Sequence, residues 1–141
     1  MSSRSRSPRA HHGKLKSDGH VKRLGTRSNP LRLVTDCSGM EAPGMALRGL
    51  GISYTSVGAG DKDANVKKFW MSHFETSNWC DDITTRNHLD VARARGHTDL
   101  YVAGFPCQPW SSAGKHGGLA DSRGTIVTHC IKCIEASKPN A

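Results

Sequence analysis

The chain has 141 residues, enough for one ordinary domain, and 35% of them are hydrophobic. Its formal net charge is +8 at pH 7, its five cysteines are odd in number and irregularly spaced, and no apolar run approaches the roughly 20 residues that span a bilayer. These features argue against a disulfide-stapled secreted domain and a membrane protein, and they predict an intracellular protein, nuclear if the source is eukaryotic.

The first 30 residues differ in composition from the rest of the chain. They are rich in Ser, Arg, Lys, Gly and His, and they hold eight basic residues against one acid, Asp18, which is +7 of the total +8. Such a segment cannot bury enough apolar surface to offset the entropy of ordering, so residues 1–30 are predicted to be a disordered basic tail. Two interpretations stay open: an arm attracted to nucleic-acid phosphates, or a solvated tail with no specific partner.

From residue 31 onward, short apolar runs alternate with helical patterns. Strands are expected at 31–35, 52–58, 76–80 and 99–103, and helices at 43–50, 63–74, 85–95 and 123–137. Strand followed by helix, repeated four times, predicts an α/β fold with a doubly wound, mostly parallel sheet. The expected core side chains are Ala64, Phe69, Trp70 and Phe74 on the second helix and Ile126, Val127, Cys130, Ile131 and Ile134 on the last.

The ends of the first three strands carry candidate binding residues. Ser38 and Gly39 lie in a turn between a strand and a helix, where small residues let the backbone approach a nucleotide, although one such turn is a weak signal. Asp61 directly follows the second strand, about 25 residues after the first turn, at the position that binds ribose hydroxyls in these folds. Its alternative role is to cap the next helix. Asp81 and Asp82 follow the third strand and either cap a helix or hold a ligand.

The segment after the fourth strand carries the strongest chemical signal. Gly104 and Pro106 end the strand, Cys107 follows at once, and the proline stiffens the backbone on which the cysteine lies. A thiolate is the best side-chain nucleophile near neutral pH. The alternative is a buried structural cysteine, but the polar residues that follow favour a functional loop that runs from 104 to about 122.

This loop resembles a known family. Residues 104–115, Gly-Phe-Pro-Cys-Gln-Pro-Trp-Ser-Ser-Ala-Gly-Lys, and residues 121–125, Asp-Ser-Arg-Gly-Thr, are similar to the nucleophile segment of the cytosine-C5 DNA methyltransferases. The resemblance covers about residues 31–141 and implies the N-terminal part of a Rossmann-like catalytic domain. It implies a fold that is incomplete at the C-terminus, because the chain ends before the glutamate, arginine and target-recognition segments of that family.

The resemblance also implies an activity. Cys107, with Pro106 and Gln108 in its loop, would add to C6 of cytosine, while S-adenosylmethionine donates a methyl group to C5. The first turn keeps Ser38 and Gly39 of the family pattern but has Cys37 in place of an aromatic residue. The implied cofactor-binding residues are Cys37, Ser38, Gly39, Asp61, Asp82, Ile83, Gly104, Pro106, Thr125 and Ile126, and the implied nucleic-acid contacts are Ser111 and Lys115.

Several alternatives remain beside this interpretation. The substrate is expected to be DNA, with transfer RNA as the alternative, and a complementing C-terminal half is an expected partner. A catalytically inactive nucleic-acid-binding module is a further interpretation. A metal site at His129, Cys130 and Cys133 is not expected, because the helical pattern explains both cysteines as core and no second pair of ligands lies nearby.

Overall fold

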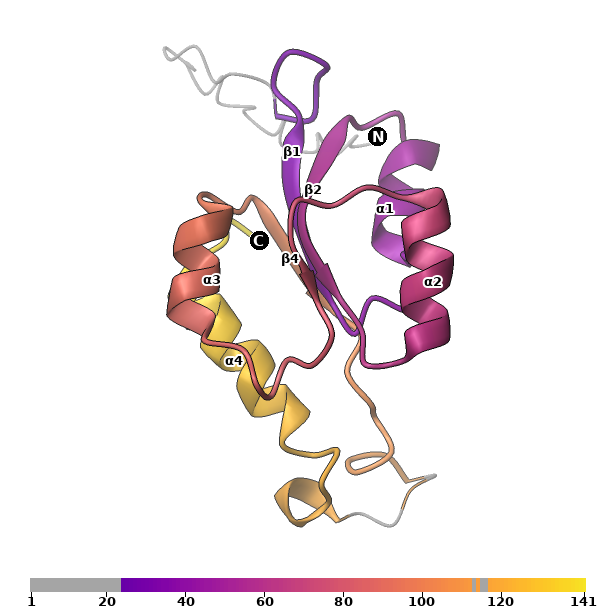
Figure 1. Cartoon of the computed structure of the whole chain (residues 1–141), viewed down its shortest axis with the longest axis vertical. Helices are drawn as coiled ribbons and strands as arrows, with labels where there is room; N and C mark the ends of the chain where they lie inside the picture. The colour runs from indigo at the N-terminus through magenta and orange to yellow at the C-terminus, as the bar shows by residue number, and fades with distance from the viewer. Residues whose placement is uncertain (1–23, 113, 115–116) are drawn as a thin grey trace, which may run out of the picture.

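A computed structural model describes residues 24–112, 114 and 117–141. Its sheet has four strands, all parallel, in the order β3-β2-β1-β4. Figure 1 shows α1 and α2 on one side of this sheet and α3 and α4 on the other. The predicted doubly wound α/β fold is therefore confirmed. The elements are β1 (Leu31–Asp36), α1 (Ala42–Gly49), β2 (Tyr54–Gly60), α2 (Ala64–His73), β3 (Trp79–Cys80), α3 (His88–Arg95), β4 (Leu100–Ala103), a short 3-10 helix (Gly118–Ala120) and α4 (Ile126–Ser137).

The strand order places a binding crevice at a defined point. The chain moves outward from β1 through β2 to β3 and then returns to the other side of β1 to form β4. The crossovers that leave β1 and β4 therefore run in opposite directions and leave a crevice beyond the carboxyl ends of the strands, where open α/β sheets bind ligands.

The hydrophobic core lies on the central strand and under α2. Leu33, Val34 and Ala59 are buried on the sheet, and Trp70 of α2 is fully buried. The Trp70 ring packs against Trp79, with ring centroids 5.5 Å apart. Trp70 also donates a hydrogen bond from its indole nitrogen to a carboxylate oxygen of Glu41 at 3.0 Å, so this core includes one buried acid.

Two predicted core faces need correction. Ala64 is exposed because it is the first residue of α2, where the helix leaves the sheet. On α4 the buried side chains are Cys130 and Cys133, whereas Ile131 and Ile134 are 49% and 44% exposed. The α-helical turn of 3.6 residues explains this difference, because 130 and 133 share one face and 131 and 134 lie about 100° further round.

Four element boundaries also differ from the prediction. The second strand spans Tyr54–Gly60, two residues later than expected. Only Trp79 and Cys80 pair with β2 in the third strand, because Thr76 and Asn78 hydrogen-bond to each other in a turn. The third helix begins at His88, where the Asn87 side chain accepts from two backbone amides, and the last helix begins at Ile126, after turns at 121–125.

Both ends of the described chain hydrogen-bond to the sheet region. Residues 24–30, assigned above to the tail, form a turn whose Gly25 carbonyl accepts from Ser53 N at 2.8 Å. The rest of the predicted tail, residues 1–23, lies outside the described residues. At the other end, Ala141 donates to the Asp99 carbonyl at 3.0 Å and accepts from Tyr101 N at 2.9 Å, which is the bonding pattern of a parallel strand beside β4.

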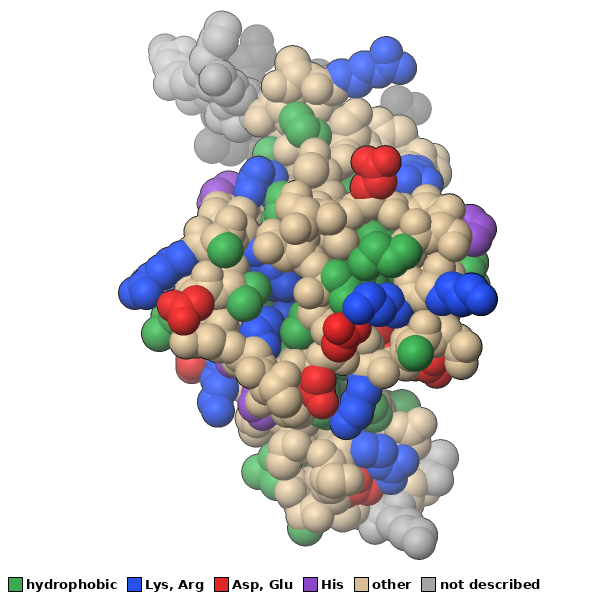
Figure 2. All heavy atoms as spheres, in the orientation of Figure 1, with side chains coloured by type: hydrophobic (Ala, Val, Ile, Leu, Met, Phe, Trp, Pro, Cys, Tyr) green, Lys and Arg blue, Asp and Glu red, His purple; other side chains and the backbone are tan. Residues whose placement is uncertain are grey.

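The described surface mixes charges of both signs. Figure 2 shows lysine and arginine side chains dispersed over one face, with aspartate and glutamate between them. Within the residues that the structure describes, none of the helices combines the length and the apolar character needed to cross a membrane.

Candidate active site

A cavity of about 1090 Å³ opens at the carboxyl ends of the strands. It gathers residues from the ends of all four strands and from the first turns of α4. Most of the residues that the sequence analysis singled out line it: Cys37, Gly39, Asp61, Asp82, Ile83, Gly104, Pro106, Cys107, Gln108, Thr125 and Ile126. The other large cavity, of about 840 Å³, lies at the opposite end of β2 and is lined by none of them.

Cys107 lies on an exposed turn at one wall of this cavity. Its side chain is exposed, and its carbonyl oxygen accepts from the backbone amides of Trp110 and Ser111, both at 2.9 Å. The loop is anchored where it leaves the sheet, because Gly104 N donates to the Asp36 carbonyl at 3.0 Å. The thiol is thus presented to the cavity from a fixed turn, and the alternative of a buried structural cysteine does not describe it.

Asp61 holds the first loop of the cavity in place. One carboxylate oxygen accepts from Gly39 N and the other from Asp63 N, each at 3.0 Å. Asp63, not Asp61, caps α2, with its side chain accepting from Asn65 N. Because each carboxylate oxygen has two lone pairs, Asp61 keeps acceptor capacity for hydroxyl groups of a ligand.

Ser38 lies behind the cavity wall, not on it. Its hydroxyl is buried and bonds to Thr35 and to both the carbonyl and the amide of Gly60 at 3.1 Å. The side chain therefore joins the end of β1 to the end of β2 and leaves Gly39, with φ of 50°, at the surface of the cavity. Apart from the neighbours of Gly39 in the chain, no atom of the described residues lies within 4 Å of the place where a Cβ on Gly39 would be, so this backbone is open to a ligand.

Asp82 and Ile83 form the wall that follows β3. Ile83 is buried, and one oxygen of Asp82 accepts from the Thr84 amide and hydroxyl at 2.9 and 2.7 Å. The other oxygen lies 3.3 Å from Lys62 Nζ. The Thr84 hydrogen bonds and the lysine hold the pKa of Asp82 below its usual value. Asp81 points elsewhere and pairs with Lys67 and Trp79.

The two predicted nucleic-acid residues lie differently. Ser111 is half-buried and does not line the cavity, although its amide belongs to the turn that holds Cys107. Lys115 lies outside the described residues. Nothing in the described chain brings three His, Cys, Asp or Glu side chains together as metal ligands, and Cys130 and Cys133 are buried on α4.

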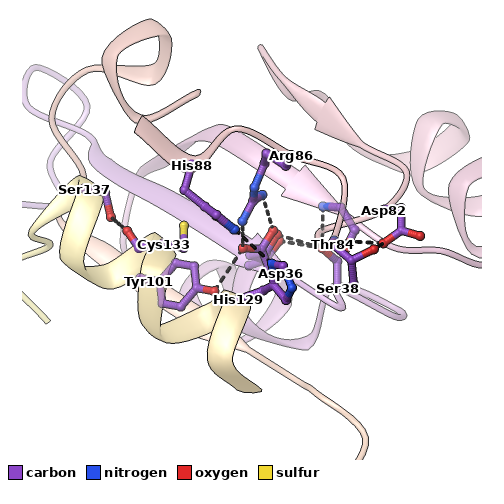
Figure 3. A network of polar contacts seen from close by, with 12 residues as sticks. Asp36, Ser38, Asp82, Thr84, Arg86, His88, Tyr101, His129, Cys133 and Ser137 are labelled. Carbon is purple, nitrogen blue, oxygen red and sulfur yellow. Dashed lines mark hydrogen bonds and ion pairs between the residues drawn. The ribbon is translucent and has the colours of Figure 1, made fainter. Parts of the chain in front are cut away.

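A buried ion pair forms the floor of the cavity. Arg86 donates from both terminal nitrogens to the two oxygens of Asp36, at 2.8 and 2.6 Å, and Tyr101 adds a hydrogen bond at 2.9 Å. Figure 3 shows Arg86 and Tyr101 converging on Asp36. The Asp36 and Arg86 side chains are 1% and 3% exposed. This network links the end of β1, the segment before α3 and β4, and thus ties three cavity walls together.

The electrostatics of this floor follow from burial. Burial alone would raise the pKa of Asp36, but the Arg86 hydrogen bonds and charge hold it below the usual value. Burial raises the pKa of the neighbouring Cys37 thiol to about 12, with contributions from Cys130, Asp36 and Asp61. Cys37 is therefore a neutral thiol at pH 7. It contributes a small, weakly polar surface where the family pattern has an aromatic ring.

A second arginine packs beneath this floor. Arg95 is 4% exposed, and its guanidinium lies against the backbone of Gly58 in β2, where a Cβ would collide with it. Only glycine allows this close approach. Burial and the nearby Arg86 charge lower the pKa of Arg95.

Sequence reasoning missed several residues of this site. Lys62, Cys80 and His129 line the cavity, and Asp36, Arg86 and Tyr101 form its floor. His129, which the sequence analysis considers only as a metal ligand, is half-buried and hydrogen-bonds to His88. These contacts join residues 41 to 65 positions apart, so the only available signal was the unusual presence of an acid at the end of a buried strand.

Comparisons with known proteins identify the family to which this site belongs. A relative from Neisseria lactamica, Type II methyltransferase M.NlaX, is 47% identical over 62 residues, which are 44% of this chain and 18% of the relative. Type II methyltransferase M.PspPI from Psychrobacter sp. (strain TA137) is 44% identical over 59 residues, 42% of this chain and 14% of the relative.

A longer alignment covers most of the chain. Orphan methyltransferase M.SPRI from Bacillus phage SPR is 33% identical over 111 residues, which are 77% of this chain and 24% of the relative. In all three relatives the matched part is less than a quarter of the protein. The model of the family described as C-5 cytosine-specific DNA methylase matches residues 33–141, and the chain belongs to that family.

Proposed function

We propose that this chain carries the nucleophile and the cofactor-binding part of a DNA cytosine-C5 methyltransferase. The observation that carries the proposal is the convergence, on one cavity, of an exposed cysteine and the residues expected to bind S-adenosylmethionine. Membership of the C-5 cytosine-specific DNA methylase family supports the same activity.

The cavity fits S-adenosylmethionine in volume and in polarity. About 1090 Å³ exceeds what a nucleoside with an amino-acid chain requires, and the ends of β1 and β2 form an open surface at Gly39. Asp61 would accept from the ribose hydroxyls, while Asp82 and Ile83 would contact the adenine. Thr125 and Ile126 would lie beside the methionine part. When bound, the cofactor supplies an electrophilic methyl group on a sulfonium.

Cys107 would act as the nucleophile toward the base. Cytosine C5 is too weak a nucleophile to accept a methyl group directly, so the thiolate first forms a bond to C6 and raises the electron density at C5. Once C5 carries the methyl group, a base such as water would remove the C5 proton, the C–H electrons would re-form the C5–C6 double bond, and the S–C6 bond would break to release the Cys107 thiolate. Pro106 and the Cys107 turn keep the sulfur in place, and Gln108 lies next to it on the cavity wall.

The target base has to leave the duplex before it can reach Cys107. A cytosine stacked and paired in a double helix hides C6, and extruding it costs a few kcal/mol. We infer that Ser111 and Lys115, which follow the nucleophile turn, contact the phosphates of the nucleic acid. Transfer RNA remains the alternative substrate and is one arm of the test below.

We further infer that repeated turnover, as distinct from formation of the single covalent adduct tested below, needs a complementing C-terminal half. The outer edge of β4 supports this inference, because Ala141 already bonds to Asp99 and Tyr101 in the pattern of a neighbouring parallel strand. The exposed Ile131 and Ile134 on α4 would suit burial by the same partner.

Mass spectrometry and calorimetry test the proposal. The full chain is mixed with a 5-fluorocytosine duplex or a 5-fluorocytosine transfer RNA, with and without S-adenosylmethionine, and the mixture is repeated with Cys107→Ser. We expect cofactor binding and a cofactor-dependent adduct with DNA that disappears in the variant, whereas Cys133→Ala, a buried cysteine outside the cavity, keeps it.

The other outcomes separate the parts of the proposal. Cofactor binding without an adduct would show that Cys107 needs the complementing half in order to react with the base. An adduct with transfer RNA alone would reassign the substrate. If neither cofactor binding nor an adduct occurs, the chain is not an autonomous cofactor-binding unit and the proposal fails.

A further inference from the structure

His129 is a cavity residue to which the family resemblance assigns no role. It lies on α4, one helical turn beyond Thr125 and Ile126, and lines the same cavity as Cys107. Its Nδ1 lies 3.2 Å from Nε2 of His88, the first residue of α3. Figure 3 shows both histidines beside the Asp36 network.

The surroundings of His88 fix the direction of this hydrogen bond. Burial, together with Arg86 and His129, lowers the pKa of His88 to about 4, so its ring is neutral at pH 7 and carries one proton. Its Nδ1 is buried and has no hydrogen-bond partner among the described residues. A proton there would be a buried, unpaired N–H, which proteins avoid more strongly than an unpaired acceptor. The proton therefore lies on Nε2, and His88 donates to Nδ1 of His129.

The direction of the bond determines which atom His129 offers to the cavity. Because Nδ1 of His129 accepts, the proton of the neutral ring lies on Nε2. The contact with His88 thus occupies Nδ1 of His129 and leaves Nε2 as the nitrogen that can donate to a ligand.

The charged groups around the cavity are already engaged. Both oxygens of Asp36 bond to Arg86, and Tyr101 adds a further bond. Arg123 donates to both oxygens of Asp121. Among the described residues, His129 has His88 as its hydrogen-bond partner, and that contact uses only Nδ1.

The charges around the cavity predict which end of a bound amphoteric ligand would lie beside His129. Asp61 places negative charge at the end of β2, where it would repel a carboxylate, whereas the charge of Asp82 at the end of β3 is offset by Lys62 at 3.3 Å. The opposite side has the start of α4, a twelve-residue helix whose N-terminus favours an anion, together with His129. An amphoteric ligand would therefore place its carboxylate toward α4.

We propose that Nε2–H of His129 donates a hydrogen bond to the carboxylate of the amino-acid end of bound S-adenosylmethionine. This inference rests on the proposed function, since it names a contact of the same cofactor. His88 is a positioning residue, because it selects the tautomer of His129 without touching the ligand.

Two substitutions separate this role from a merely structural one. The amide nitrogen of His129→Gln reaches the place of Nε2 and can still donate to the ligand, whereas His129→Asn places its polar atoms only near Nδ1 and keeps the contact with His88. We expect His129→Asn to weaken the binding of S-adenosylhomocysteine about tenfold, and His129→Gln to bind as the native chain does. A structural role predicts the reverse order.

Calorimetry with two ligands identifies the contacted group. The first ligand is S-adenosylhomocysteine, and the second is its analogue without the carboxylate, which we expect the native chain and His129→Asn to bind equally. His97→Asn serves as the control, because His97 lies outside the cavity and pairs with Asp99. Thermal unfolding of each variant confirms that it is folded.

A third measurement needs no ligand. Nitrogen-15 chemical shifts of the histidine rings in the full chain are expected to show His129 as the neutral Nε2–H tautomer, and His88→Phe is expected to abolish that preference. Equal affinities of His129→Asn and the native chain for S-adenosylhomocysteine would overturn the inference while the proposed function stands. If the native chain binds neither ligand, both the inference and the cofactor assignment fail.

Discussion

Individual side chains of the cavity differ sharply in their chemistry. Cys107 and Cys37 both line it, but Cys107 is exposed on a turn, whereas burial raises the pKa of Cys37 to about 12. At pH 8 about one Cys37 in 10⁴ would be a thiolate. Cys37 lies where the family pattern has an aromatic residue, and of these two cavity thiols only Cys107 is exposed.

Alkylation rates should reveal this difference. With iodoacetamide at pH 8, we expect Cys107 to be modified first and Cys37, Cys130 and Cys133 to react at least a hundredfold more slowly, because they are buried or have raised pKa values. Peptide mapping by mass spectrometry measures each rate. In denaturant the five cysteines should react alike, and a Cys37 that is modified as fast as Cys107 in the folded chain would contradict the structure.

At the residue scale, the local motif was readable and the long-range contacts were not. The Cys107 segment is contiguous, so its proline, cysteine and glycine residues indicate a functional loop before any fold is known. From the sequence, Glu41 is only one residue of the turn between the first strand and the first helix. In the structure Glu41 is fully buried with φ of 58° and accepts from Thr35 at 2.9 Å and from Trp70 at 3.0 Å, partners that no local pattern names.

The Asp36–Arg86 ion pair joins three elements and should control their stability. Both side chains are nearly inaccessible, so Arg86→Met would leave a buried carboxylate without its partner and should lower the free energy of unfolding by about 3–5 kcal/mol. Urea denaturation measures this value. Lys67→Met, which breaks the exposed Lys67–Asp81 pair, is the matched control and should lower the free energy of unfolding much less than Arg86→Met does. Similar losses in the two variants would contradict the buried role of Asp36.

The same pair predicts a pH dependence of stability. The pKa of Asp36 is lower in the folded chain than its ordinary value of 3.8, so its contribution is complete above that value and disappears as the pH falls through the folded pKa. We expect the stability difference between the native chain and Asp36→Asn to be constant from pH 7 to 5 and to shrink below about pH 4. Urea denaturation across this range measures it. A difference that persists unchanged at pH 2 would mean that the carboxylate charge is not what stabilises the fold.

At the element scale, the type and order of strands and helices were predictable, and their ends were not. Alternation of short apolar runs with helical patterns indicates β1 to α4 correctly, because each type of periodicity is local. The third strand is shorter than the predicted 76–80, since Thr76 and Asn78 satisfy their polar groups in a turn. Asn87 caps α3 later than expected because Asp82 organises a separate turn over Thr84 and Thr85.

Most of the positive net charge of the chain lies in its first 23 residues. Residues 1–23 carry seven lysines and arginines and one aspartate, whereas the face of the described part in Figure 2 mixes both signs. Long-range attraction to a polyanion therefore depends on the tail more than on the domain.

The salt dependence of DNA binding tests how much of the attraction to DNA comes from residues 1–23. Each phosphate neutralised in duplex DNA adds about 0.9 to the slope of log K against log salt concentration. Deleting residues 1–23 should thus reduce the slope by at most about 6, and any residual binding should come from the cavity side. Fluorescence anisotropy at several salt concentrations measures both slopes. An unchanged slope would show that the tail makes no phosphate contacts.

The central position of β1 also governs how the molecule folds. β1 pairs on one side with β4, and the contact between Arg32 and Asp99 spans 67 residues. Closing a loop of that length costs about 4 kcal/mol of chain entropy before the new contacts compensate for it. Sheets with such distant partners fold slowly compared with helical bundles. Until β1 and β4 pair, Cys107 has no opposite wall, so the cavity at the carboxyl ends of the strands cannot form before that closure.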